Sequence, residues 1–183
     1  MNAGSRSEAE WLINKEPQRG YTVAPLIGLD QLHELIELRL LIEPPTAAAA
    51  ARLATPRQAR ELRAFARTRG AGGEDPAANR LDMNYDATFH DMVAELGGNA
   101  LARETLARLR SHLHMYRLYH HAGQAAATKP EHVAVARAIA AGEPDTAHAA
   151  MEAHLRTALG RLDAVFAAGR AKAVGAGSGD PGA

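Results

Sequence analysis

Residues 29–54, with the sequence LDQLHELIELRLLIEPPTAAAAARLA, have the pattern of one long amphipathic helix. Apolar side chains recur at helical spacing on one face, at Leu32, Leu35, Ile36 and Ile42. Because Arg39 follows Leu35 by four residues, we expect its side chain to point toward the same buried face. Pro44 and Pro45 interrupt the pattern, and we expect them to break or kink the helix.

The composition of the whole chain also favours helices. Aromatic residues make up only 4% of the 183 residues, and alanine, the best helix former, is abundant. Strands prefer β-branched and aromatic residues, and only residues 15–23, with Pro17 and Gly20 between short extended pieces, indicate a hairpin. Since short connections make neighbouring helices antiparallel, we predict an all-α, antiparallel six- to seven-helix bundle, preceded by a short wing-like segment.

Capping residues indicate where the following helices begin and end. Thr55 as N-cap, with Gln58 as its capping-box partner, predicts a helix that ends near residue 69. The next helix should begin near residue 76 and end at Gly97 and Gly98, and Asn99 should cap the one after it.

The last two helices are predicted in the same way. Thr128 and Glu131 flank Pro130 as a capping-box pair, which predicts a short helix that begins there and that Gly142 ends. A final helix is expected over residues 144–168.

Charge and composition limit the possible classes of protein. Lys plus Arg and Asp plus Glu each number 21, so the chain lacks the overall basic charge typical of a complete DNA-binding module. The absence of cysteine excludes a disulfide framework and a cysteine-based zinc site. No signal peptide and no apolar run of roughly 18 residues is present, so we expect a soluble, cytoplasmic protein without a membrane partner.

The most distinctive local pattern is DATFH at residues 86–90. Asp86 and His90 are four residues apart, so they share one helix face, which Phe89 and Val93 flank with apolar surface. A buried carboxylate needs a partner, and either a metal ion or the histidine itself could supply it. From this pair alone, a metal site and a local Asp–His hydrogen bond both remain open.

Two more histidines lie near the end of the chain. His132 is expected to open the penultimate helix, and His154 is flanked by apolar residues at helical spacing, so it should face the core. A lone inward histidine is more often a satisfied core residue than a ligand. Together with Asp86 and His90, however, the two histidines give three imidazoles and one carboxylate, a set that suits first-row divalent ions such as zinc or nickel.

Five fragments of the chain, in order, resemble the FadR-type C-terminal ligand-binding domain (FCD domain) of GntR-family transcription regulators. They are ELRLLIE (37–43) with the alanine run after it, DATFH (86–90), GNAL (98–101), EHVAVARAI (131–139) and AHAAMEAHL (147–155). The spacing between His132 and His154 also agrees with the family pattern.

The resemblance implies a divalent transition metal, zinc or nickel, held by Asp86, His90, His132 and His154. It also implies a small organic acid effector, bound beside or onto the metal. Arginine binds carboxylates in a bidentate manner, so we expect Arg39 to bind the effector, with Arg117 as the second candidate. Arg39 could equally form an ion pair with Glu43, four residues along the same helix.

The segment EAEWLINKEPQRGYTV (8–23) resembles the end of the family's winged helix-turn-helix domain, although Trp11 stands where the family usually has glycine. We therefore expect three parts: a remnant of the winged helix-turn-helix (1–26), the effector-binding domain (27–169) and a disordered tail (170–183). A helix-turn-helix reads DNA through its recognition helix, so operator binding is expected only where the complete winged helix is present.

The best interpretation is the effector-sensing, dimerising domain of a GntR/FadR-type transcriptional regulator, a homodimer and not an enzyme. One alternative is a metal-dependent enzyme on a helical bundle, although no HExxH glutamate stands beside the ligands. Another is a shortened inhibitor that forms heterodimers with full-length regulators.

Overall fold

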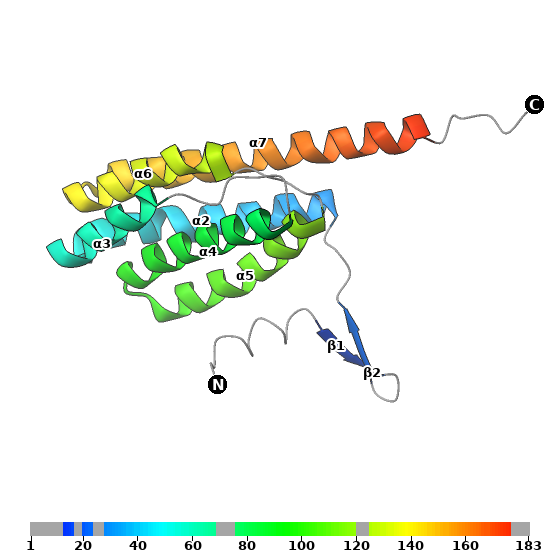
Figure 1. Ribbon diagram of the computed structural model, residues 1–183. Helices are drawn as coiled ribbons and strands as arrows, with labels where there is room; N and C mark the ends of the chain where they lie inside the picture. Colours follow the sequence, from blue (N-terminus) through cyan, green and yellow to red (C-terminus); the bar gives the residue numbers. More distant parts are fainter. Residues whose placement is uncertain (1–12, 17–19, 24–27, 69–75, 120–124, 177–183) are drawn as a thin grey trace, which may run out of the picture.

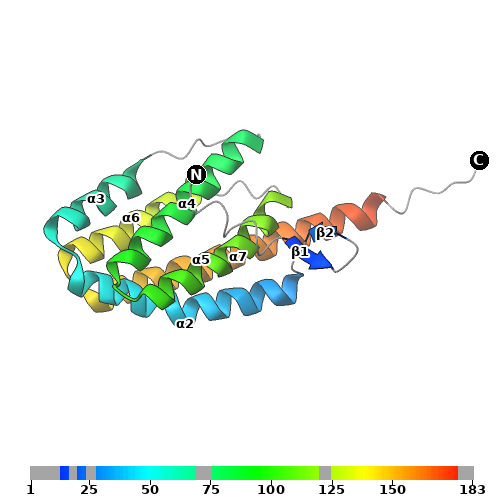
Figure 2. The same ribbon diagram turned by 90° about the horizontal axis from the view of Figure 1, so that it is seen from below.

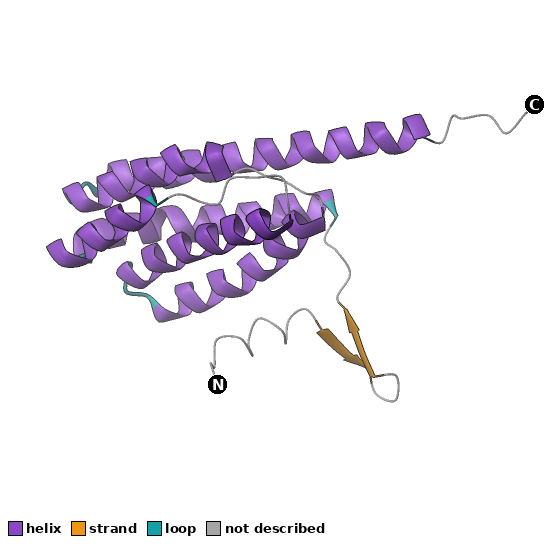
Figure 3. Ribbon diagram, viewed as in Figure 1, coloured by secondary structure: helices purple, strands orange, loops and turns teal. Residues whose placement is uncertain are grey.

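A computed structural model of the chain describes the backbone of residues 13–16, 20–23, 28–68, 76–119 and 125–176, and the side chains of residues 28–68, 84–109 and 128–168. These parts contain a two-stranded hairpin and six helices (Figures 1 and 3). In chain order they are β1 (Ile13–Glu16), β2 (Gly20–Val23), α2 (Leu29–Leu53), α3 (Pro56–Arg67), α4 (Pro76–Leu96), α5 (Ala100–Tyr119), α6 (Ala125–Ala141) and α7 (Pro144–Ala176). The predicted all-α bundle is confirmed.

Helix α2 is in contact with most of the other helices. It packs against α4, α5, α6 and α7, while α3 covers α6 and α4 (Figure 2). The C-terminal part of α7 extends beyond the other helices (Figure 1), and this helix ends later than the predicted position near residue 168. None of the described helices is long and apolar enough to cross a membrane.

A break or a kink was expected at Pro44 and Pro45, and the break is wrong, because α2 is one helix that contains both prolines. A proline inside a helix removes a backbone hydrogen bond and crowds the preceding turn, at a cost of about 3 kcal/mol or more. Packing against four other helices outweighs this cost, since the residues that follow the prolines are almost all buried: Thr46, Ala47, Ala48, Ala50 and Ala51.

Several of the predicted helix ends are confirmed. Thr55 caps α3, with its hydroxyl accepting from the Gln58 backbone N–H and its own N–H donating to the Gln58 side chain. The Asn99 side chain accepts a hydrogen bond from the backbone N–H three residues later. Gly98 and Gly142, which follow α4 and α6, have φ values of 74° and 67°, a region that glycine occupies without steric cost.

The predicted start of α6 is wrong. The helix begins before Thr128 and contains Pro130 in its interior, so Thr128 and Glu131 do not form its capping box. This difference matters for the site, because the Glu131 carboxylate bonds to His154 and Arg161 on α7 instead.

The main hydrophobic core lies between α2, α3, α4, α6 and α7. Its largest buried side chains are Leu62, Phe89, Val93, Val135, Ile139, Met151 and Leu155. A second cluster joins the first turns of α2 to α7 through Leu32, Leu35, Ile36 and Leu162. Several charged and polar side chains are also buried in the bundle, and they form the site described below.

The predicted hairpin is confirmed, with antiparallel pairing from Ile13 opposite Val23 to Glu16 opposite Gly20. It lies outside the helical bundle (Figure 1). Residues 1–12 of the expected winged-helix remnant and residues 177–183 of the expected tail lie outside the described residues, whereas residues 170–176 of that tail are helical and belong to α7.

Candidate metal centre

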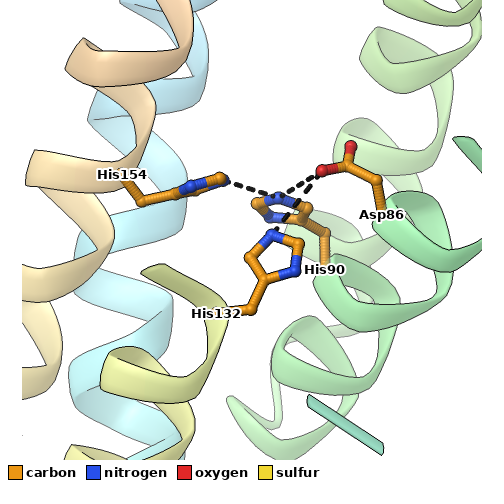
Figure 4. A group of neighbouring side chains, drawn as sticks. All are labelled: Asp86, His90, His132 and His154. Atoms are coloured by element: carbon orange, nitrogen blue, oxygen red, sulfur yellow. Dashed lines mark hydrogen bonds and ion pairs between the residues drawn. The ribbon is translucent and has the colours of Figure 1, made fainter. Parts of the chain in front are cut away.

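Four side chains from three helices converge at one buried point (Figure 4). Asp86 and His90 lie one turn apart on α4, His132 lies on α6, and His154 lies in the first half of α7. One ligand atom of each residue lies within 4.8 Å of the others, and all four residues are buried. These are the four residues that the resemblance assigns to a metal.

The separations between their ligand atoms are close to those of a metal centre. The Nε2 atoms of His90 and His154 are 3.1 Å apart. Asp86 Oδ1 lies 3.8 Å from His90 Nε2 and 3.6 Å from His132 Nε2. Adjacent ligands about 2.0–2.2 Å from one ion are separated by roughly 3.0–3.5 Å, so small side-chain movements would bring these atoms around one ion. The donor set and its geometry therefore fit a divalent transition metal.

A buried carboxylate orients His90 from the opposite side of its ring. His90 Nδ1 lies 2.5 Å from Oε2 of Glu43, whose other oxygen accepts from Arg39 Nε at 2.6 Å. Burial alone would raise the pKa of Glu43, but the charges and hydrogen bonds of Arg39 and His90 hold this pKa well below its usual range. Because an ionised carboxylate only accepts hydrogen bonds, His90 Nδ1 carries the proton. Nε2 is the ring nitrogen of His90 that faces the other ligands.

A second carboxylate acts on His154 in the same way. Glu131 Oε2 lies 2.8 Å from His154 Nδ1, and Arg161 donates to both oxygens of Glu131 at 2.6 and 2.9 Å. Burial would raise the pKa of Glu131, but the hydrogen bonds and charges of His154 and Arg161 lower it to about 2. His154 Nδ1 is therefore the donor. Burial lowers the pKa of His154, against the opposing effect of Glu131, so its ring is neutral and its Nε2 lone pair faces the site.

The two chains of hydrogen bonds have the same order of partners, from an arginine through a glutamate to a histidine of the site. Arg39 and Glu43 orient His90, and Arg161 and Glu131 orient His154, so that the two Nε2 atoms meet. In most protein metal sites a ligating histidine donates its other N–H to a carboxylate or carbonyl, which sets its tautomer and makes it a better ligand. Two nitrogens 3.1 Å apart with lone pairs toward each other could hold a cation between them.

Aromatic side chains position the third histidine. The His132 ring stacks on Phe89, with centroids 4.0 Å apart and an interplanar angle of 14°. The ring of Tyr85 also lies beside the His132 ring, with centroids 5.6 Å apart. The Tyr85 hydroxyl donates a hydrogen bond to the carbonyl of Ala66 near the end of α3. Stacking on Phe89 therefore positions this ligand within the site.

Effector binding stays a prediction for both expected arginines, Arg39 and Arg117, and the structure describes the side chain of Arg39. Arg39 is 1% exposed and forms the ion pair with Glu43, so the ion-pair interpretation of this residue is confirmed. Its Nη2 also lies 3.5 Å from His90 Nε2, which places the guanidinium beside the candidate metal ligands. Arg117 lies on α5, but its side chain is outside the described residues, so its role stays a prediction.

The sequence did not indicate the roles of Glu131 and Arg161 or the contact of Glu43 with His90. The sequence does carry one weak signal, because Arg161 follows His154 by seven residues and so lies on the same face of α7. Glu43 and His90 are 47 positions apart in the sequence, and Glu131 and His154 are 23 apart, so a local sequence pattern does not predict either contact.

The model of the FCD domain family matches residues 34–157, which is most of the chain. The chain belongs to the FCD family. FCD domains are the regulatory domains of GntR-type transcription regulators, which are not enzymes, and the resemblance seen in the sequence is confirmed. No protein among those with curated functions matches the sequence of this FCD domain.

Solved structures show the same fold. A GntR protein of Streptococcus agalactiae has a TM-score of 0.56 at 23% identity, covering 84% of this chain and 77% of its own. McbR/YncC of E. coli has a TM-score of 0.70 at 15% identity, covering 88% and 78%. The metal-free FCD domain of TM0439 has a TM-score of 0.60 at 14% identity, covering 79% and 99%.

Proposed function

We propose that this FCD domain senses a small organic acid through a bound divalent metal and controls, as a cytoplasmic dimer, the DNA binding of a GntR-type regulator. One observation supports the metal most directly. Three imidazoles and one carboxylate converge in a buried place, and two of the imidazoles are oriented by carboxylates on their far side. The proposed ligands are Asp86, His90, His132 and His154.

The donor set favours zinc or nickel. Imidazole nitrogen suits zinc, copper, iron and nickel, whereas magnesium and calcium prefer oxygen ligands throughout. Four protein ligands leave one or two positions free on an ion that takes five or six ligands, and an effector can occupy them. Because the ligands come from α4, α6 and α7, the ion would also join three helices of the bundle.

The charges around the site favour an anionic effector. Arg39 neutralises Glu43, and Arg161 neutralises Glu131, so among the ligands found in the described residues Asp86 supplies the negative charge that compensates a divalent ion. The occupied site would keep one positive charge, and a buried charge is costly without a partner. Since Arg39 Nη2 lies 3.5 Å from His90 Nε2, a carboxylate bound to the ion could also accept a hydrogen bond from this guanidinium.

Metal analysis of the purified protein tests the proposal. We expect close to one divalent transition metal per chain, and a double variant His132→Ala/His154→Ala should lose it. His33→Ala is the matched control, because His33 pairs with Asp163 away from the cluster. Binding to the native state alone stabilises by about 4 kcal/mol at a thousandfold excess over Kd, so chelation should lower the Tm of the wild type and of His33→Ala only. Full metal occupancy in the double variant would refute the assignment.

Calorimetry with hydroxy acids and dicarboxylic acids tests the effector. Acids should bind the metal-loaded protein more tightly than the metal-free protein, and neutral sugars of similar size should bind neither form. Arg39→Met should weaken acid binding by about 1.5–3 kcal/mol if one charge-assisted hydrogen bond is lost, measured at a metal concentration that keeps the site loaded. Equal affinity of the two forms for every acid would make the metal purely structural.

We also propose a homodimer in which α2 contributes to the contact. Leu38 and Leu41 lie on one exposed face of this helix, and 47% and 73% of their surface is open to solvent. Symmetric dimers are the commonest assemblies of soluble proteins, and such an apolar face suits a second copy. The hairpin of β1 and β2 would be the wing of a winged helix, and operator DNA is a proposed partner only where that domain is complete.

A further inference from the structure

The second carboxylate chain of the site, formed by Glu131 and Arg161, differs from the first in its exposure. Arg39 and Glu43 are almost fully buried, with side-chain exposures of 1% and 3%. Arg161 and Glu131 are 19% and 21% exposed, so this chain reaches from the inner ligand His154 to the surface of the bundle. The contact between Glu131 Oε2 and His154 Nδ1 connects this chain to the site.

We propose that Glu131, held by Arg161, is the positioning residue that sets the tautomer of His154 and thereby the metal affinity of the site. Glu131 on α6 receives two hydrogen bonds from the Arg161 guanidinium on α7, which leaves its Oε2 in line to accept the His154 Nδ1 proton. With the proton on Nδ1, the Nε2 lone pair is free for the ion. This inference rests on the proposed metal site, because it names the residues that prepare one of its ligands.

Glu131 prepares His154 for the metal by accepting a hydrogen bond from its ring, and not by filling space beside it. A neutral imidazole carries its single proton on either nitrogen, and only the nitrogen without the proton can bind a metal. His154 Nε2 lies 3.1 Å from His90 Nε2, and both must be free of protons when an ion binds between them. A carboxylate at Nδ1 selects that state before the metal arrives. Loss of such partners in other metal sites typically weakens binding 10–100-fold.

The test compares variants of Glu131 in the full chain. Glu131→Met keeps the length of the side chain but removes the acceptor, and we expect zinc to bind 10–100-fold more weakly in competition with a chromophoric chelator. Glu131→Gln keeps an acceptor oxygen without the charge, so its affinity should fall between those of the wild type and Glu131→Met. Arg161→Met should weaken zinc binding less than Glu131→Met, because the acceptor remains but loses its support.

Glu152→Met is the matched control. Glu152 lies on α7 and accepts hydrogen bonds from Arg156, and the side chains of this pair are more exposed than those of Glu131 and Arg161, at 38% and 66%. Zinc affinity within twofold of the wild type is expected for this variant. A loss equal to that of Glu131→Met would show a general effect of removing surface carboxylates and would overturn the inference.

A second measurement needs no metal. Long-range ¹H–¹⁵N NMR on the metal-free protein, labelled at histidine nitrogen, distinguishes Nδ1–H from Nε2–H, and His154→Asn assigns the signals. We expect Nδ1–H in the wild type and a shift toward Nε2–H in Glu131→Met. An Nε2–H tautomer in the wild type, or an unchanged tautomer in Glu131→Met, would overturn the inference. If the wild type bound no zinc, the proposed function would fail, while the tautomer would still decide the role of Glu131.

Discussion

Loss of one partner from the buried ion pair of Arg39 and Glu43 should be strongly destabilising, although the same loss from an exposed pair should not. Both Arg39–Glu43 and Arg57–Glu61 are i,i+4 pairs, with N–O distances of 2.6 and 2.8 Å. The side chains of the first pair are 1% and 3% exposed, and those of the second are 82% and 53% exposed. Burial is therefore the main difference between them.

Removal of one partner from a buried pair leaves the other charge uncompensated and costs about 3–5 kcal/mol. We expect this loss for Arg39→Met in the metal-free protein, because Glu43 keeps its bond to His90 but loses its cationic partner. In a domain of this size each kcal/mol lowers Tm by about 2–4 °C, so the expected decrease is roughly 6–20 °C. Arg57→Met should leave Tm unchanged, because water already solvates both charges of the exposed pair.

Urea unfolding followed by circular dichroism, with chelator present, measures these differences. A double-mutant cycle with Glu43→Gln separates the ion pair from the lost packing of the arginine stem. The double variant Arg39→Met/Glu43→Gln should lose less stability than the sum of the two single variants. Strict additivity, or equal effects of Arg39→Met and Arg57→Met, would refute the reasoning that burial makes this pair important.

Three further predictions follow from the described side chains. Gly97→Ala should lower the free energy of unfolding by about 1–3 kcal/mol, because a Cβ there would lie 2.5 Å from the Thr46 methyl carbon and 2.9 Å from the Thr46 carbonyl oxygen. Gly160→Ala has open space around the new Cβ, so it should raise the free energy of unfolding, measured in urea, by roughly 0.5–1 kcal/mol. Burial, with a smaller contribution from the neighbouring Asp86 charge, raises the pKa of Tyr85 to about 12. A spectrophotometric titration should therefore show a late step that Tyr85→Phe abolishes. The stability that this group contributes is present below pH 10 and is lost as the pH rises toward 12. Leu41→Glu should shift light-scattering mass toward the monomer, and a concentration-independent monomer in the wild type would refute the dimer.

Local patterns in the sequence predicted most of the helices. The hydrophobic spacing of residues 29–54, the Thr55 capping box and the glycines after α4 and α6 are all interactions within a few residues, so they can be read along the chain. Asp86 and His90 were paired for the same reason, since one helical turn brings them together wherever the helix lies. The assignment of His132 and His154 to the same site depended on the family resemblance.

Where local rules failed, long-range packing was the cause. Proline rules predicted a break in α2, but burial of the turns after Pro44 and Pro45 against other helices outweighs the lost hydrogen bonds. Capping rules assigned Glu131 to the start of α6, but its carboxylate bonds to His154 and Arg161 on the next helix. In both cases a tertiary contact competes with the local one and is stronger.

The sequence by itself determined that this FCD domain is helical, where many of its helices begin and end, and which residue types could bind a metal. Only the tertiary structure decided that α4, α6 and α7 bring four ligand atoms within 4.8 Å of one another, and that Glu43 and Glu131 stand behind two of the histidines. The physical reason is range. Helix propensity and capping act over a few residues, whereas the orientation of a buried imidazole depends on charges that other helices carry from distant parts of the chain.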